Sequence, residues 1–234
     1  YLERDAHHSV AGNIYKGRVE NVLPGMQAAF VNIGLERNAF LYVDDALAHL
    51  NGTEEVVEAP RVRSIDDVLT EGQEIVVQVV KEPIGTKGAR VSTNLTVPGR
   101  YLVLMPTVDH VALSRRITDE AERQRLKEIA RDIRPPGMGL IVRTLAVGKD
   151  RETLAQDCRF LMGVWEGIQR RAQTAAAPAL LYEDYDLIYR LVRDEFTPEV
   201  GRFVVDDEEV YKKVLDLLDS LSPAIASLLA EGPW

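Results

Sequence analysis

Apolar and polar positions alternate with a period of two in the first third of the chain. Runs rich in β-branched and aromatic residues cover residues 14–23, 26–33 and 39–43, and turn-forming residues separate them. This spacing predicts a meander of short strands. In the first run, successive side chains point to opposite sides of the strand. Ile14, Lys16 and Arg18 therefore lie on one side, and the residues between them lie on the other.

Two further runs, at residues 74–80 and 89–97, bring the number of predicted strands to five. Five short strands are typical of an OB-fold barrel. Helical patterns follow the barrel along the chain, so the predicted fold class is α+β. The hairpin at residues 82–88 connects the last two strands, and the cations in and beside it are Lys81, Lys87 and Arg90.

Phe30 and Phe40 are the most informative aromatic residues of this region. The short connection at residues 34–38 can place them on neighbouring strands, where they would present an aromatic face for RNA bases. The alternative is that both are core residues, which composition alone favours because phenylalanine is usually buried. In the context of the barrel we expect an RNA-binding face, and its candidate residues are Lys16, Arg18, Phe30, Phe40, Lys81 and Lys87.

A second region begins at Pro98 and Gly99. Residues 101–105 form an apolar run, and Thr118 is a candidate N-cap for a helix that ends at residues 135–137. A buried strand is predicted at residues 139–144. The longest helix follows residues 147–150, and its apolar positions recur at steps of four and three on one face. These positions are Leu154, Cys158, Leu161, Trp165, Ile168 and Ala172.

Two features that suggest chemistry are better explained by structure. Gly148 and Lys149 do not form a phosphate-binding loop, because Arg143 and Asp150 stand where that loop needs a glycine and a Ser or Thr. We expect a helix N-terminus there. Cys158 lies on a packing face, whereas a reactive thiol needs an exposed, electropositive setting. The last part of the chain predicts a helix at residues 187–195 and another that follows Asp206 and Asp207.

Composition narrows the classes of function. The 234 residues carry a net charge of −9, which argues against gripping duplex DNA through bulk positive charge. Residues 99–188 hold fourteen Lys and Arg against thirteen Asp and Glu, whereas the parts before and after each carry −5. A local cationic pocket for one RNA end fits this distribution, and its affinity should be modest and salt-sensitive.

The sequence also bears on compartment and metal binding. A single cysteine excludes an internal disulfide framework and is consistent with the cytoplasm. No run of eighteen apolar residues occurs, and residues 1–8 do not have the pattern of a signal peptide, so we expect neither a membrane span nor export. The four histidines are scattered, and we expect no metal site in this chain.

Five blocks of sequence carry a resemblance to a known family: GNIYKGRV, AAFVNIG, ERNAFL, KGARVSTNLTVPGRYLVLMP and GMGLIVRT. In order and spacing they resemble the ribonuclease E/G family of bacterial endoribonucleases over nearly the whole chain. The resemblance implies an OB-fold RNA-binding domain at residues 12–97, an α/β domain at 98–188 that senses a 5′-monophosphate, and partial RNase-H-like segments at 1–11 and 189–234. It also implies Mg²⁺-assisted cleavage of single-stranded RNA by a homo-oligomeric parent protein, in RNA processing and decay.

The resemblance further implies a pocket for an RNA 5′-monophosphate, formed by Gly99, Val103, Arg143 and Thr144. Arg143 can offer two donors to phosphate oxygens, and Thr144 can add a hydroxyl and a backbone N–H. Gly99 has no Cβ, so a terminal nucleotide could approach its backbone. The alternative for Arg143 is a surface ion pair. The neighbouring cations Arg115 and Arg116 could add charge.

The catalytic parts of the family are not recognised in this sequence. The family supplies two metal-binding aspartates in short motifs after apolar strands, and a cysteine pair that binds a shared zinc. We therefore assign no catalytic residue here, and expect the Mg²⁺ ligands to lie outside this chain. A free-standing, non-catalytic RNA-binding adaptor remains an alternative. A third possibility, an enzyme with an unrecognised site, is disfavoured because no paired nucleophile and base is found.

Overall fold

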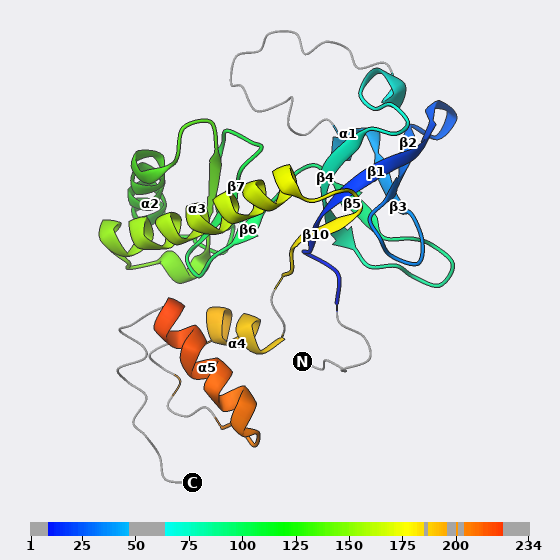
Figure 1. Ribbon diagram of the computed structural model, residues 1–234. Helices are drawn as coiled ribbons and strands as arrows, with labels where there is room; N and C mark the ends of the chain where they lie inside the picture. Colours follow the sequence, from blue (N-terminus) through cyan, green and yellow to red (C-terminus); the bar gives the residue numbers. More distant parts are fainter. Residues whose placement is uncertain (1–8, 47–63, 185–186, 196–199, 201–203, 222–234) are drawn as a thin grey trace. The chain divides into compact units, whose positions relative to one another are not determined.

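The computed structural model describes residues 9–46, 64–184, 187–195, 200 and 204–221. Residues Val10–Asp184 form one compact unit, and helices α4 (Leu187–Glu195) and α5 (Glu208–Leu221) belong to a second one. Figure 1 shows the β-barrel of the larger unit in blue to cyan and its long helix α3 (Arg151–Thr174) in yellow-green. None of the helices in the described segments has the length and apolar character that a bilayer crossing requires.

The first five strands close into a barrel. They are β1 (Ile14–Leu23), β2 (Ala28–Asn32), β3 (Ala39–Tyr42), β4 (Glu74–Lys81) and β5 (Arg90–Ser92). Neighbours pair in the order β1-β2-β3-β5-β4, and β4 pairs with β1 again, so the five strands close on themselves. Within this barrel the β3–β5 pair is parallel and the other neighbouring pairs are antiparallel. The predicted α+β class with a five-stranded barrel is confirmed.

The core of the barrel comes from alternating positions. Tyr15 and Val19 of β1 are buried against residues such as Val31, Leu41 and Val77, whereas the alternate β1 positions face outward. Ile14 is an exception among these outward positions, because it is buried. Its pairing with Gln78 of β4 continues the register of Tyr15 with Val77 without a shift, and Ile14 is not part of the barrel core. Ile14 therefore keeps its outward side of β1, where it is buried together with Gln78.

The strand predicted at residues 89–97 is wrong as a single element. Strand β5 ends at Ser92, and β6 (Val97–Pro98) belongs to a second sheet. The buried side chain of Gln78 explains the division: its Oε1 accepts from the Thr96 N–H at 2.8 Å, and its Nε2 donates to the Thr96 carbonyl at 2.9 Å. A side chain thus replaces the strand partner that Thr96 would otherwise need.

The second sheet has the order β6-β7-β9-β8, with β7 at Leu102–Met105, β8 at Val111–Leu113 and β9 at Gly139–Val142. Helix α2 (Glu120–Ile133) contacts β8 and β9, and α3 (Arg151–Thr174) contacts β7. The predicted apolar face of α3 is confirmed from Leu154 to Ile168, and it includes Cys158. Burial raises the pKa of the Cys158 thiol, as expected for a packing residue.

Both long helices begin at a capping residue, as predicted, but the residue that caps α2 is not the predicted one. Helix α2 is capped by Asp119, whose carboxylate accepts from the Glu122 N–H at 2.7 Å, and not by Thr118. Asp150 caps α3 through the Thr153 N–H at 2.8 Å. The Gly148-Lys149 pair directly precedes this cap, as predicted, and the N–H of Gly148 donates to Glu122 Oε1 of α2 at 2.8 Å.

The chain returns to the barrel after α3. Strand β10 (Ala179–Tyr182) pairs antiparallel with the first residues of β1, on the side that β4 does not occupy. This strand lies within the range 98–188, which the sequence assigns to the second domain. The domain ranges themselves stay predictions.

The smaller unit contains α4 (Leu187–Glu195) and α5 (Glu208–Leu221), which contact each other and bury Val192 and Val214. Asp207 caps α5 by accepting from the Val210 N–H at 2.9 Å, as predicted for this segment. The predicted RNase-H-like character of residues 189–234 stays a prediction. Most of residues 1–11 lie outside the described residues.

Candidate nucleic-acid interface

Three aromatic rings lie together on the outer face of β2 and β3. Phe30 pairs directly with Phe40 across the two strands, and their ring centroids are 5.5 Å apart, edge to face. The ring of Tyr42 is 4.4 Å from that of Phe40, also edge to face. Both phenylalanines are half-buried, while their strand neighbours Ala29, Val31, Ala39 and Leu41 are buried. The rings therefore point away from the barrel core.

Cations continue this aromatic row across the barrel. Arg90 of β5 pairs with Phe40, and Lys81 of β4 pairs with Arg90. Phe30, Phe40, Arg90 and Lys81 thus form one row over four strands, which we call the outer row. Lys87 is exposed and lies in the β4–β5 hairpin, where its backbone pairs with that of Ile84, so it is beside the row and not in it.

Lys16 and Arg18 face outward from β1, but their charges are shared with one carboxylate. Lys16 Nζ and Arg18 Nη2 each lie 2.9 Å from a Glu74 oxygen. The ammonium of Lys16, followed by weaker attractions including that of Arg18, lowers the pKa of Glu74. Lys16 also donates to the Ala175 carbonyl at 2.9 Å. These two predicted RNA contacts are therefore separate from the outer row, and Lys16 has a structural role between α3 and the barrel.

The four predicted phosphate-pocket residues lie at one end of the second sheet. Arg143 follows β9, its backbone N–H donates to the Tyr101 carbonyl at 2.8 Å, and its Nη1 donates to the Gly99 carbonyl at 2.7 Å. Val103 of β7 pairs with Ile141 of β9, two residues before Arg143. Thr144 comes next in the chain and is exposed. The structure thus brings Gly99 and Arg143 into contact and places Val103 and Thr144 beside them.

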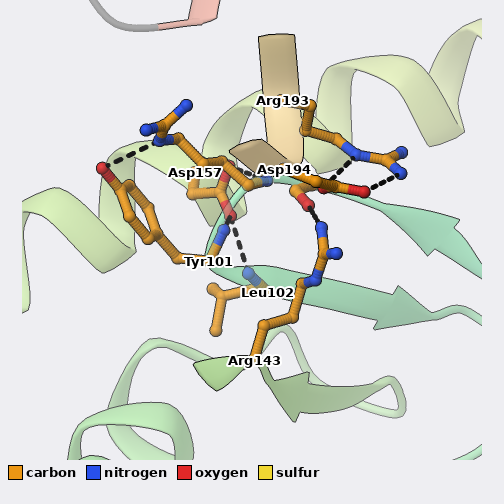
Figure 2. A network of polar contacts seen from close by, with 8 residues as sticks. Tyr101, Leu102, Arg143, Asp157, Arg193 and Asp194 are labelled. Atoms are coloured by element: carbon orange, nitrogen blue, oxygen red, sulfur yellow. Dashed lines mark hydrogen bonds and ion pairs between the residues drawn. The ribbon is translucent and has the colours of Figure 1, made fainter. Parts of the chain in front are cut away.

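A partly buried carboxylate fixes the backbone at this end of the sheet. Asp157 of α3 accepts from the N–H groups of Arg100, Tyr101 and Leu102, at 3.2, 2.9 and 2.8 Å. Figure 2 shows Asp157 directed at the backbone of Tyr101 and Leu102, with Arg143 below. Burial raises the pKa of Asp157, although the three N–H donors and the charge of Arg143 oppose this.

The structure gives a different reason for Gly99 from the one expected. A Cβ on Gly99 would lie 2.8 Å from Asp157 Oδ2 and 3.0 Å from Leu161 Cδ1. The close approach of α3 therefore requires glycine here, and the space beside its Cα is filled by the protein itself.

Two residues beside this pocket were not singled out by the sequence pattern. The Tyr101 ring has Arg100 Cζ at 5.6 Å and Lys149 Nζ at 5.8 Å from its centroid, within the range of cation–π attraction. Asp157 is the other. The sequence feature that could have identified Asp157 is its spacing, because it lies three residues after Leu154 and one before Cys158, on the apolar face of α3.

The loop after β8 reaches the same site. The hydroxyls of Ser114 and Thr144 are 3.0 Å apart, and the N–H of Arg116 donates to the Ser114 hydroxyl at 3.3 Å. Arg115 and Arg116 are exposed, and they directly follow Ser114, whose hydroxyl contacts Thr144 of the pocket. In the described part of the chain, no three His, Cys, Asp or Glu side chains are grouped so that they could hold a metal ion.

Comparison with known proteins gives the class to which this barrel and sheet belong. The model of the ribonuclease E/G family matches residues 96–231. The chain belongs to the ribonuclease E/G family.

Individual relatives extend the similarity over the barrel. Ribonuclease G of Escherichia coli strain K12 is 41% identical over 232 residues, which cover 98% of this chain and 47% of that protein. Ribonuclease E of Nostoc sp. strain PCC 7120 is 48% identical over 218 residues, 92% of this chain and 30% of that protein. Ribonuclease G of Haemophilus influenzae is 40% identical over 230 residues, 98% of this chain and 47% of that protein. The chain thus spans about half the length of these relatives or less.

Proposed function

We propose that this chain is the RNA-binding and 5′-end-sensing part of a ribonuclease E/G-type endoribonuclease that acts on single-stranded RNA in the cytoplasm. One observation carries the binding proposal: the outer row places two half-buried aromatic rings beside two cations on the face of a closed barrel. Aromatic rings stack with unpaired bases, and an exposed cation such as Lys81 attracts the phosphates. Base-paired RNA hides its bases in a stack, so the surface suits single strands.

The second sheet supports the 5′-end proposal. Arg143 has one donor on the Gly99 carbonyl, which orients its planar guanidinium, and Thr144 adds a hydroxyl at the same end of the sheet. A 5′-monophosphate offers several charged acceptor oxygens, and arginine binds such groups through two donors at once. Arg115 and Arg116 would raise the local positive potential.

The activity of the whole protein is a proposal from family membership. We infer a Mg²⁺-dependent hydrolysis of RNA, in a protein that assembles from several copies. The described residues do not fit the metal, since none of their acidic, His or Cys side chains form a group of three. The metal would be held by residues other than these, and this chain by itself would not cleave. A non-catalytic RNA-binding adaptor is the second candidate function. The sequence after Trp234 in the source gene distinguishes the two candidates. Aspartates after apolar strands there would support the nuclease, and a stop codon would support the adaptor.

Replacement of either phenylalanine tests the binding face. Phe30→Ala and Phe40→Ala should each weaken binding of a labelled single-stranded RNA by about 1–3 kcal/mol per lost base stack. Fluorescence anisotropy at fixed salt measures the change. Both rings are half-buried, so the loss of folding stability should stay below the roughly 3–5 kcal/mol of a core phenylalanine.

Leu180→Ala is the matched control for this test. Leu180 is 47% exposed on β10 of the same sheet and lies outside the outer row, so its removal should leave the RNA affinity at the wild-type value. Wild-type affinity in both phenylalanine variants would contradict the binding face. A stability loss of core size would show instead that the rings mainly support the barrel.

Incubation with RNA tests the assignment of catalysis. The chain should leave a 5′-monophosphorylated single-stranded RNA intact in the presence of Mg²⁺, because the described residues supply no metal-binding group. Product analysis on a denaturing gel measures this. Cleavage that EDTA suppresses, and that follows the protein through purification, would refute the assignment.

A further inference from the structure

Tyr42 is the most exposed of the three clustered rings, and none of the candidate roles above includes it. It is the last residue of β3 and lies two positions after Phe40, so the two side chains share the outer face. Its exposed fraction is 41%, whereas Phe30 and Phe40 are half-buried. The residue opposite Tyr42 on β2 is Ala28, a small side chain that is fully buried, so the exposed part of the ring is not shared with it.

The ring is nevertheless held in one position. The guanidinium carbon of Arg90 lies 4.9 Å from the Tyr42 ring centroid, a cation–π contact. Arg90 is itself fixed, since its Nε and Nη2 donate to Asp45 Oδ2 at 2.9 and 2.7 Å. An exposed ring with such support loses little conformational freedom when it binds a ligand.

Asp45 is also fixed through its backbone. It belongs to the short helix α1 (Val43–Ala46), which directly follows Tyr42. The Asp45 carbonyl accepts from the Ser92 hydroxyl at 3.2 Å and from the Thr93 hydroxyl at 2.9 Å. The chain on both sides of the ring is therefore tied to β5, and the Asp45 carboxylate offsets the charge of Arg90. This pairing suits Arg90 to orienting the ring more than to attracting phosphates.

We propose that Tyr42 is a third base-stacking position for single-stranded RNA, next to Phe40, and that Arg90 and Asp45 are its positioning residues. The proposal rests on the proposed RNA-binding function and extends it. The three rings meet edge to face, so they present different planes and would hold three bases splayed apart. The ligand is a run of at least three unpaired nucleotides, without base preference, because every base has a π face.

The test uses the full chain and oligouridylates with a 5′-hydroxyl, which exclude any contribution of a terminal phosphate. Tyr42→Ala should weaken binding of a six-nucleotide probe roughly 5- to 100-fold, and Tyr42→Phe should stay within about twofold of wild type, since the ring is kept. Met26→Ala is the matched control, because Met26 is a 59% exposed apolar residue in the β1–β2 connection, outside the cluster. Thermal midpoints verify that each variant is folded.

A double substitution tests the positioning role. Arg90→Lys keeps the charge but loses the planar group, and should weaken binding in the wild-type background while having no effect beside Tyr42→Ala. Phe30→Ala distinguishes failure of the third stacking position from failure of the whole RNA-binding face. If it weakens binding and Tyr42→Ala does not, the third position is refuted and the binding face stands. If neither weakens binding, both are refuted; if Arg90→Lys acts equally in both backgrounds, Arg90 contacts RNA independently of Tyr42.

Discussion

Arg143→Lys should remove most of the preference of this chain for RNA with a 5′-monophosphate over the same RNA with a 5′-hydroxyl. A charge-assisted hydrogen bond contributes about 1.5–3 kcal/mol, so the wild-type preference should be roughly tenfold or more. The ammonium of lysine is a point charge without the planar fork, and it cannot keep the bond to the Gly99 carbonyl while gripping two phosphate oxygens. Affinities for the two RNAs are compared at one salt concentration.

Three further variants sharpen this experiment. Thr144→Val removes the hydroxyl that could contact the phosphate, whereas Ser114→Ala removes only its 3.0 Å partner. The first should lower the preference more than the second. Arg170→Lys, at an exposed position near the end of α3, is the matched control and should keep the wild-type preference. Equal affinities for the two RNA ends in the wild type would mean that these residues do not form a phosphate pocket in this chain.

Asp157→Ala should be the most destabilising single change near the pocket. It would leave three backbone N–H groups of residues 100–102 without their acceptor in a buried place, and each such group costs about 1–3 kcal/mol. The loss of unfolding free energy should be at least about 3 kcal/mol. Denaturant unfolding measures it.

Asp157→Asn is the matched conservative variant. Its amide oxygen can still accept from Tyr101 and Leu102, so only the 3.2 Å bond from Arg100 is lost and the cost should be about 1 kcal/mol. The 5′-monophosphate preference should fall with the Ala variant more than with the Asn variant, because the Gly99 carbonyl that orients Arg143 precedes the tethered segment. Equal stability of wild type and Asp157→Ala would contradict this role.

The same carboxylate predicts a pH dependence. Its pKa is raised in the folded protein, so the folded state binds the proton more readily than the unfolded state does. The contribution of Asp157 to stability therefore declines as the pH rises through the raised pKa, and is more favourable below it. Asp157→Asn should lack this component. The difference between the unfolding free energies of the two proteins, measured across the acid range, isolates it from other carboxylates.

Local patterns were enough to predict most elements of this fold. The period of two at residues 14–23 matches the bounds of β1, and the steps of four and three identified the buried face of α3. Helix caps were predicted in kind, but adjacent Thr118 and Asp119 are both good caps, and the local chain geometry decides between them.

What the sequence could not predict depends on groups distant along the chain. The early end of β5 follows from Gln78, a side chain on another strand, and β10 becomes a strand only because β1 offers it an edge. The candidate site likewise has a part that local sequence predicted and a part that depends on distant residues. The predicted pocket residues lie together, but the reason for Gly99 and the tether by Asp157 come from α3, more than fifty residues later in the chain.

The pairing of β10 with β1 has a consequence for the order of folding. The strands that close the barrel all lie between residues 14 and 92, whereas β10 joins Ile14–Lys16 only after residues 179–182 have been synthesised. Closing so long a loop is entropically slow compared with the local strand pairings, so this contact should form last. Until then the backbone groups on one side of Ile14–Lys16 are unpaired. In a nascent or shortened chain, this exposed strand edge can pair with another molecule.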